Sequence, residues 1–265
     1  SNGSSAYSSE ASATTTSART VTLSGGGGTV TEGDSNSQSV TLTATISATS
    51  TQATTVTLSA NTTPADAGSV SGTANVDKDW TFGSSTITIP AGSLTGTTTI
   101  VIYGDNVDEN DEKAYVVVSG VSGGEGAVEN GNQTAEVTIT DDDTVKLKWS
   151  TVGDDVSVDE DGWEVTSTTL VLDSQPNGNV VVDATVTDSS ELTIGLGTTT
   201  TFTPSNWFNG QSITVRGAND NIDDGDVVSQ LRITVNTSST TDTTGYASLS
   251  SKNKNITTRD DDTAG

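Results

Sequence analysis

Two acidic segments recur along this chain at nearly the same spacing. Asp105–Asp111 (DNVDEND) returns 115 positions later as Asp220–Asp226 (DNIDDGD). Asp141–Thr144 (DDDT) returns 119 positions later as Asp260–Thr263. Nearly equal offsets indicate a tandem repeat of one domain, and 265 residues suit two domains of ordinary size. We therefore expect a flexible Ser/Thr-rich leader over residues 1–18, a first domain over 19–143 and a second over 144–265.

The composition narrows the functions that this chain can have. It holds 35 acidic and 10 basic residues, for a net charge of −25, so a phosphate backbone or an anionic lipid surface would be repelled. His and Cys are both absent, which excludes disulfides, thiolate metal sites and histidine bases. Aromatic residues make up only 4%, whereas sugar clefts usually offer aromatic platforms. We expect no enzyme, no nucleic-acid partner and no membrane insertion, since no apolar run is long enough to cross a bilayer.

The hydrophobic pattern predicts an all-β chain. Short alternating segments are separated by Gly, Asn, Asp and Ser, and no stretch has a convincing period of 3.6 residues. About seven strands per copy predict two tandem immunoglobulin-like antiparallel β-sandwiches. The four glycines Gly25–Gly28 are expected to form a bulge inside the first edge strand. The expected strands are 20–24 with 29–31, 39–47, 54–60, 86–89, 97–103, 113–119 and 134–140, then 145–149 with 156–158, 166–172, 179–186, 199–203, 211–216, 227–235 and 249–258.

Strand parity sorts the acidic residues. In an antiparallel sandwich, the ends of the first, third, fifth and seventh strands lie at one pole. In the first copy the acids Glu32, Asp77 with Asp79, the Asp105 loop and the Asp141 trio follow these strands in turn. The second copy repeats the order, starting at Glu160 and Asp188. A solvated turn is the simpler explanation for each loop alone, but repetition and parity together favour a site for a hard cation.

These residues resemble the Calx-beta domains of sodium/calcium exchangers, integrin β4 and large bacterial surface proteins. The motifs that carry the resemblance span about Arg19 to Asp143, and the second copy departs from them because Val227 stands where Glu112 would be. The resemblance implies the Calx-beta type of sandwich and Ca²⁺ bound at one pole through carboxylates. The matching motifs are Thr31-Glu32-Gly33, Gly72-Thr73-Ala74 before Asp79-Trp80, Asp105 through Glu109 and Glu112 before Tyr115, and Val137–Ile139 before Asp141–Asp143.

The candidate metal ligands are carboxylates at these poles, and which members of each Asp trio point inward is left open. In the first copy they are Glu32, Asp79, Asp105, Asp108, Glu109, Glu112, Asp141, Asp142 and Asp143. In the second copy they are Glu160, Asp188, Asp220, Asp223, Asp224, Asp226, Asp260, Asp261 and Asp262.

The function expected from this pattern is mechanical. We expect a calcium-binding extender module of a secreted or cell-surface protein of the adhesin type, a monomeric fragment stiffened by Ca²⁺ at the junction between domains. Its expected partners are neighbouring repeats of the parent chain, together with a surface ligand or glycan. A calcium-sensing regulatory module and a carbohydrate- or surface-ligand-binding module remain the alternatives.

Overall fold

Two β-sandwiches follow one another along the chain. The computed structural model describes residues 17–65, 79–150, 156–163 and 165–263, and nearly all its regular structure is β-strand. Each sandwich packs two sheets face to face, which confirms the predicted fold class. The sheet orders are β5-β7-β3-β1-β9 and β2-β10-β8-β4-β6 in the first sandwich, and β11-β13-β17-β15 and β12-β19-β18-β14-β16 in the second. The strands of the first are β1 (Thr20–Gly25), β2 (Thr29–Thr31), β3 (Ser37–Ile46), β4 (Thr54–Ala60), β5 (Trp80–Phe82), β6 (Thr86–Ile89), β7 (Thr95–Tyr103), β8 (Glu112–Gly123), β9 (Val128–Glu129) and β10 (Thr134–Thr140); those of the second are β11 (Leu147–Trp149), β12 (Val156–Asp159), β13 (Val165–Leu172), β14 (Val180–Val186), β15 (Leu192–Leu196), β16 (Thr199–Phe202), β17 (Gln211–Gly217), β18 (Val227–Val235) and β19 (Lys252–Arg259).

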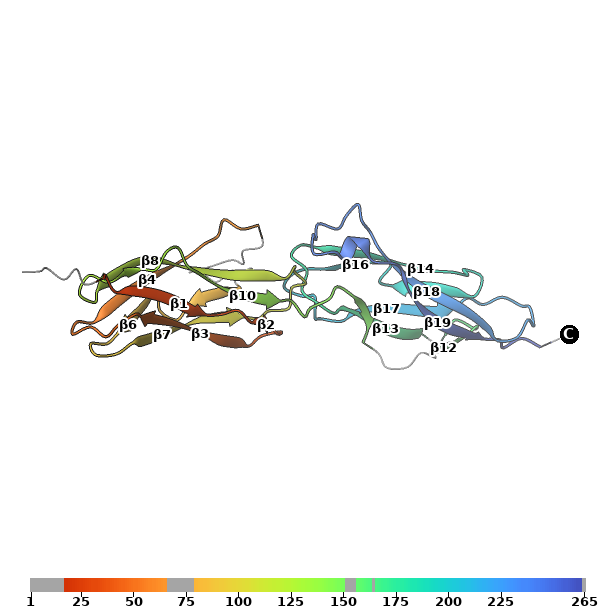
Figure 1. Cartoon of the computed structure of the whole chain (residues 1–265). Coiled ribbons are helices and arrows are strands. Elements are labelled where there is room, and N and C mark those ends of the chain that lie inside the picture. Colours follow the sequence, from red (N-terminus) through yellow and green to blue (C-terminus); the bar gives the residue numbers. More distant parts are fainter. Residues whose placement is uncertain (1–16, 66–78, 151–155, 164, 264–265) are drawn as a thin grey trace, which may run out of the picture.

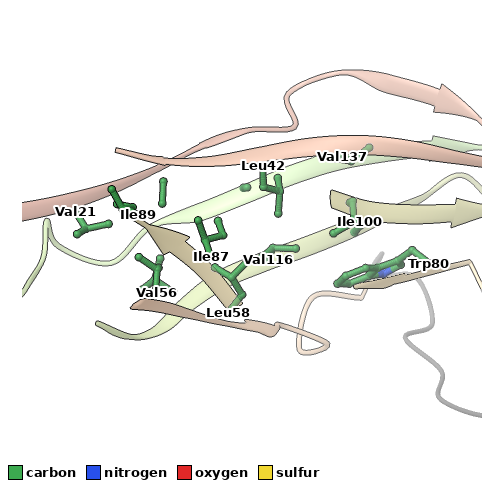
Figure 2. Packing of buried hydrophobic residues seen from close by; sticks show 14 of the residues in the cluster. Val21, Leu42, Val56, Leu58, Trp80, Ile87, Ile89, Ile100, Val116 and Val137 are labelled. Atoms are coloured by element: carbon green, nitrogen blue, oxygen red, sulfur yellow. The ribbon is translucent and has the colours of Figure 1, made fainter. Parts of the chain in front are cut away.

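Alternation of apolar and Thr residues builds each core. In β3, Leu42, Ala44 and Ile46 are buried while the residues between them face outward. Figure 2 shows Leu42 and Ile100 of one sheet meeting Val56 and Ile87 of the other. Full burial of such side chains contributes about 1.5–3 kcal/mol each.

The glycines Gly25–Gly27 carry the first strand from one sheet to the other, and all three have positive φ. β1 pairs with β3 in one sheet, whereas β2 pairs in parallel with β10 in the opposite sheet. The expected bulge inside one edge strand is therefore wrong. A Cβ at Gly25 or Gly26 would collide with a backbone carbonyl, so only glycine fits this crossover.

The crossover places the acidic residues of the first pole. β2 and β10 end side by side, with Thr31 opposite Thr140, so Glu32 emerges beside Asp141. The second sandwich repeats this arrangement, because β12 pairs in parallel with β19 and Asp159 lies opposite Arg259.

The two sandwiches lie end to end, and β10 leads directly into the junction (Figure 1). The acidic pole of the first sandwich therefore faces the second, while the matching pole of the second lies at the far end of the molecule. Among the described residues, no helix is long and apolar enough to cross a bilayer.

Candidate metal centres at the acidic poles

Each acidic loop begins with the same turn. The amide of Val107 donates to Asp105 Oδ1 at 2.7 Å, and the amide of Ile222 donates to Asp220 Oδ1 at 2.8 Å. Asp side chains favour such local bonds to the backbone two residues on. The repeated sequence thus folds into repeated geometry at two poles.

The Asp trios form a second matching pair of turns. Asp143 N donates to Asp141 Oδ1 at 3.2 Å, and Asp262 N donates to Asp260 Oδ1 at 2.9 Å. Each turn brings the backbone amide of the third aspartate to the carboxylate of the first. In both sandwiches the carboxylate of this third aspartate has a buried Oδ2 atom with no hydrogen-bond partner: it belongs to Asp143 in one and to Asp262 in the other. Buried carboxylate oxygens without a partner are costly in a folded protein.

In the second sandwich, Glu160, Asp260 and Asp262 each direct one carboxylate oxygen to a common point. The three oxygens lie within 4.8 Å of one another. Glu160 is only 5% exposed, and its Oε1 accepts the Asp220 amide at 3.0 Å. That hydrogen bond lowers the pKa of Glu160, but burial and the charges of Asp220, Asp260 and Asp262 raise it overall. Three convergent carboxylate oxygens suit a hard divalent cation, and one of the three residues, Asp262, also carries the unpartnered buried Oδ2.

The first sandwich gathers carboxylates at the matching pole, but among the described residues only the second pole brings three carboxylate oxygens within 4.8 Å of one another. Burial, followed by the negative charges of Asp105, Glu109, Asp141 and Asp79, raises the pKa of Glu32 to about 9. Burial and four neighbouring aspartates raise the pKa of Asp143 to about 7. In the absence of a cation, these carboxylates therefore oppose one another's ionisation.

Most of the predicted ligands lie in or beside one of these clusters. Asp142 Oδ1 accepts the Gly33 amide at 2.9 Å, and Asp226 Oδ1 accepts the Asp260 amide at 3.3 Å. The charge of Asp224 raises the pKa of Glu191. Asp223 and Asp261 are neighbours of Asp262 and raise its pKa by their charge.

Three predicted ligands lie at the margins of these clusters, although the charges of Asp188 and Asp108 still raise the pKa values of Glu191 and Asp141. Asp188 is exposed and caps a turn, where it accepts bonds from the amide and hydroxyl of Ser190 that lower its pKa. Asp108 and Glu112 line a cavity at the domain junction, together with Asn177 of the second sandwich. Asp77 lies outside the described residues.

Two further acidic residues, Glu191 and Asp34, belong to the poles but were not among the predicted ligands. Glu191 is 9% exposed, and its backbone carbonyl accepts the Ala218 amide just as the Asp79 carbonyl accepts the Tyr103 amide. Glu191 is therefore the counterpart of Asp79, each directly preceding an edge strand. Burial and the charges of four acidic neighbours raise its pKa. Asp34 acts on Asp143 in the first cluster, so its charge also belongs to that pole.

The loop of the first pole is in contact with the second sandwich. The Gln175 amide donates to the Asn106 carbonyl at 2.5 Å, and Val107 is only 4% exposed. Burial and the charge of Asp242, in the second sandwich, raise the pKa of Asp108. The first acidic pole is thus also the interface between the domains.

No protein-family model and no curated protein matches this chain. Among solved structures, CBD12 from CALX1.2 is similar at 20% identity and a TM-score of 0.34, over 78% of this chain and 76% of that one. Calcium binding domain CBD12 of CALX1.1 is similar at 18% identity and a TM-score of 0.37, over the same shares. Titin domains z1z2, solved in complex with telethonin, are 13% identical with a TM-score of 0.40, over 95% of this chain and 100% of that one. These sequence identities and TM-scores are all low.

Proposed function

We propose that this chain is a calcium-binding structural module with one cation site at the acidic pole of each sandwich. The observation that carries the proposal is the pair of buried, unpartnered oxygens, Asp143 Oδ2 and Asp262 Oδ2, at equivalent positions in two carboxylate clusters. A cation among the carboxylates removes both the desolvation cost and the mutual repulsion. Glu160, Asp260 and Asp262 would hold it at the second pole; Glu32, Asp141 and Asp143 would hold it at the first.

Calcium is the cation that suits these clusters. Ca²⁺ accepts six to eight oxygen ligands in adaptable geometry, whereas Mg²⁺ demands near-ideal octahedral geometry and loses its water reluctantly. The ligands here come from loops after separate strands, such as Glu160 after β12 and Asp260 after β19. Such a set is easier to fit around the larger and more tolerant ion.

The location of the first proposed site supports an extender role. A cation at that pole would tie Glu32 to the Asp141 trio within a few residues of the start of the second sandwich. We infer a secreted or surface-displayed parent protein of the adhesin type, whose neighbouring repeats are the partners of this one. In a medium rich in calcium, a structural site needs a Kd of only about 10⁻⁴–10⁻³ M, whereas a cytosolic sensor needs micromolar affinity or better. A calorimetric titration therefore separates the extender from the regulatory alternative.

The first prediction tests binding itself. A ligand that binds only the folded state stabilises it by about 2.7 kcal/mol at a hundredfold excess over Kd, so the melting temperature should rise with Ca²⁺ and fall in chelator. Glu160→Gln combined with Asp262→Asn should remove the part of this rise that comes from the second sandwich.

Glu125→Gln is the control variant, because Glu125 pairs with Arg19 away from both acidic clusters; it deletes one negative charge, whereas the pole variant deletes two. Melting curves of the native protein that are identical in calcium and in chelator would refute the proposed function. Equal losses from the pole variant and the control would reduce it to an effect of bulk charge.

A further inference from the structure

Val107 and Ile222 occupy the same position in the two acidic loops, yet their surroundings differ. Both backbone amides donate to the aspartate two residues earlier, so the two turns match. The Val107 side chain is 4% exposed, whereas the Ile222 side chain is 61% exposed. Because the local fold is the same, the difference arises from what covers the loop.

The second sandwich covers Val107 with a preformed polar surface. Val107 lines the junction cavity with Asn177, Thr243 and Thr244. Asp242 is buried and fixes this surface by accepting the Asn177 amide at 3.0 Å and the Thr244 hydroxyl at 3.0 Å. The Gln175 amide nearby donates to the carbonyl of Asn106, which precedes Val107. One apolar side chain and one backbone carbonyl of the loop thus form the contact.

The far pole presents the same features without a cover. Asn221 precedes Ile222 as Asn106 precedes Val107, and both loops are followed along the chain by the connector sequence Asp-Asp-Asp-Thr. Trp163, which closely follows Glu160 at this pole, is 87% exposed. Aromatic side chains are enriched at the centres of protein interfaces, and charged ones are depleted there.

We propose that the loop Asp220–Asp226, with Ile222 at its centre, is a docking surface for a further β-sandwich of this fold. The partner would contact the loop with the pole at which its own first strand begins, so that the two are joined head to tail as the first and second sandwiches are. Continuity with the observed junction identifies this partner, since the surface that covers Val107 belongs to such a sandwich. An anionic lipid surface would instead be repelled by the carboxylates around Ile222. The inference goes beyond calcium binding and rests on the apolar contact.

The test extends the protein by one repeat. Residues 145–263 are duplicated directly after Thr263, so that the second and third sandwiches share the connector that joins the first two. The chain has no Cys, so Thr201→Cys in the second sandwich and in its duplicate places exactly two spin labels, on an exposed position of β16. With calcium present, the distance between the labels should be narrowly distributed. Ile222→Asp in the second sandwich should broaden that distribution.

Val228→Asp is the matched control, because Val228 is also 61% exposed and gains the same charge, but it lies on β18 rather than in the loop. The control should leave the distribution narrow. The melting temperature of the Ile222→Asp variant should still rise with calcium. This result distinguishes loss of docking between sandwiches from loss of cation binding. A distribution that is equally broad with Ile222 and with Asp at this position would overturn the proposal. Self-association of the original two-domain chain in sedimentation experiments would also overturn the proposal if Ile222→Asp abolished it. The surface would then bind a second copy of the chain instead of a following sandwich.

Discussion

Two carboxyl groups of the first pole make the cation-free protein sensitive to pH. The pKa of Glu32 is raised to about 9 and that of Asp143 to about 7, in both cases chiefly by burial and then by neighbouring negative charges. The folded state therefore holds protons that the unfolded chain releases near pH 4. Their contribution to stability is fully present below the unfolded pKa values and is lost as pH rises toward the folded ones.

The second prediction follows from the direction in which these two groups make stability change with pH. In chelator, the free energy of unfolding should fall as pH rises from about 5 to about 9, by at most about 1.4 kcal/mol for each unit of pKa difference. Glu32→Gln should flatten the slope, because the amide carries no charge to desolvate. Urea denaturation at a series of pH values measures the slope.

Calcium should abolish or reverse this dependence, because it binds the ionised carboxylates and releases their protons. Glu125→Gln should keep the slope of the native protein in chelator. Stability that rises with pH in chelator would contradict the pKa shifts on which this prediction rests.

The location of the acidic poles was predictable from the sequence, but the ligand geometry within them was not. Strand parity placed Glu32, the Asp105 loop and the Asp141 trio at one end, and the structure brings them there. Strand parity could not show which of two nearby acidic residues enters the cluster. Asp188 caps a turn, whereas Glu191, three residues later, is buried. Glu191 directly precedes Leu192 at the start of one edge strand, just as Asp79 directly precedes Trp80 at the start of another. Because neither edge strand was predicted, the equivalence of Glu191 and Asp79 could not be recognised from the sequence.

Among the elements, the long strands and the short edge strands β2, β6, β11, β12 and β16 were predicted, whereas β5, β9 and β15 were not. β5 has three residues and β9 has two, too few to show a period of two. The last strand was expected from Leu249 but begins at Lys252, because Tyr246–Ser248 form a short 3-10 turn. Tyr246 is fully buried and its hydroxyl donates to the Ser174 carbonyl at 2.7 Å, a contact between distant segments that no local pattern indicates. Trp163 is 87% exposed and lies outside both cores.

The third prediction concerns the glycine crossover between β1 and β2. Gly26 and Gly27 have nearly the same φ, +72° and +70°, but a Cβ at Gly26 would meet the Glu136 carbonyl oxygen whereas a Cβ at Gly27 meets nothing. Gly27→Ala should cost only the strain of the left-handed backbone, about 1–2 kcal/mol. Gly26→Ala should cost measurably more, because the collision is with backbone that cannot turn aside. Urea denaturation of the pair isolates the steric part, and equal losses would show that the backbone yields there.

At the scale of the whole molecule, the connection between the sandwiches is short and already in contact. Val145, two residues beyond Asp143, packs against the core of the second sandwich, and the Gln175 amide donates to Asn106 across the junction. With the first site empty, its carboxylates repel one another at the base of this connector. A cation bound at the proposed site would draw the same carboxylates together and fix Asp141–Asp143 against Glu32.

The last prediction is that calcium narrows the range of angles between the two sandwiches. Small-angle X-ray scattering should give an extended shape with a narrow distribution of maximum dimensions in calcium, and a broader distribution in chelator. Val107→Asp should broaden the distribution even in calcium, because it places a charge in the buried contact, while the melting temperature still rises with the ion. Val228→Asp, on the flank of the second sandwich, should behave as the native protein does. Identical scattering with and without calcium would remove the stiffening mechanism even if calorimetry showed binding, since the cation would then stabilise each sandwich without ordering the joint between them.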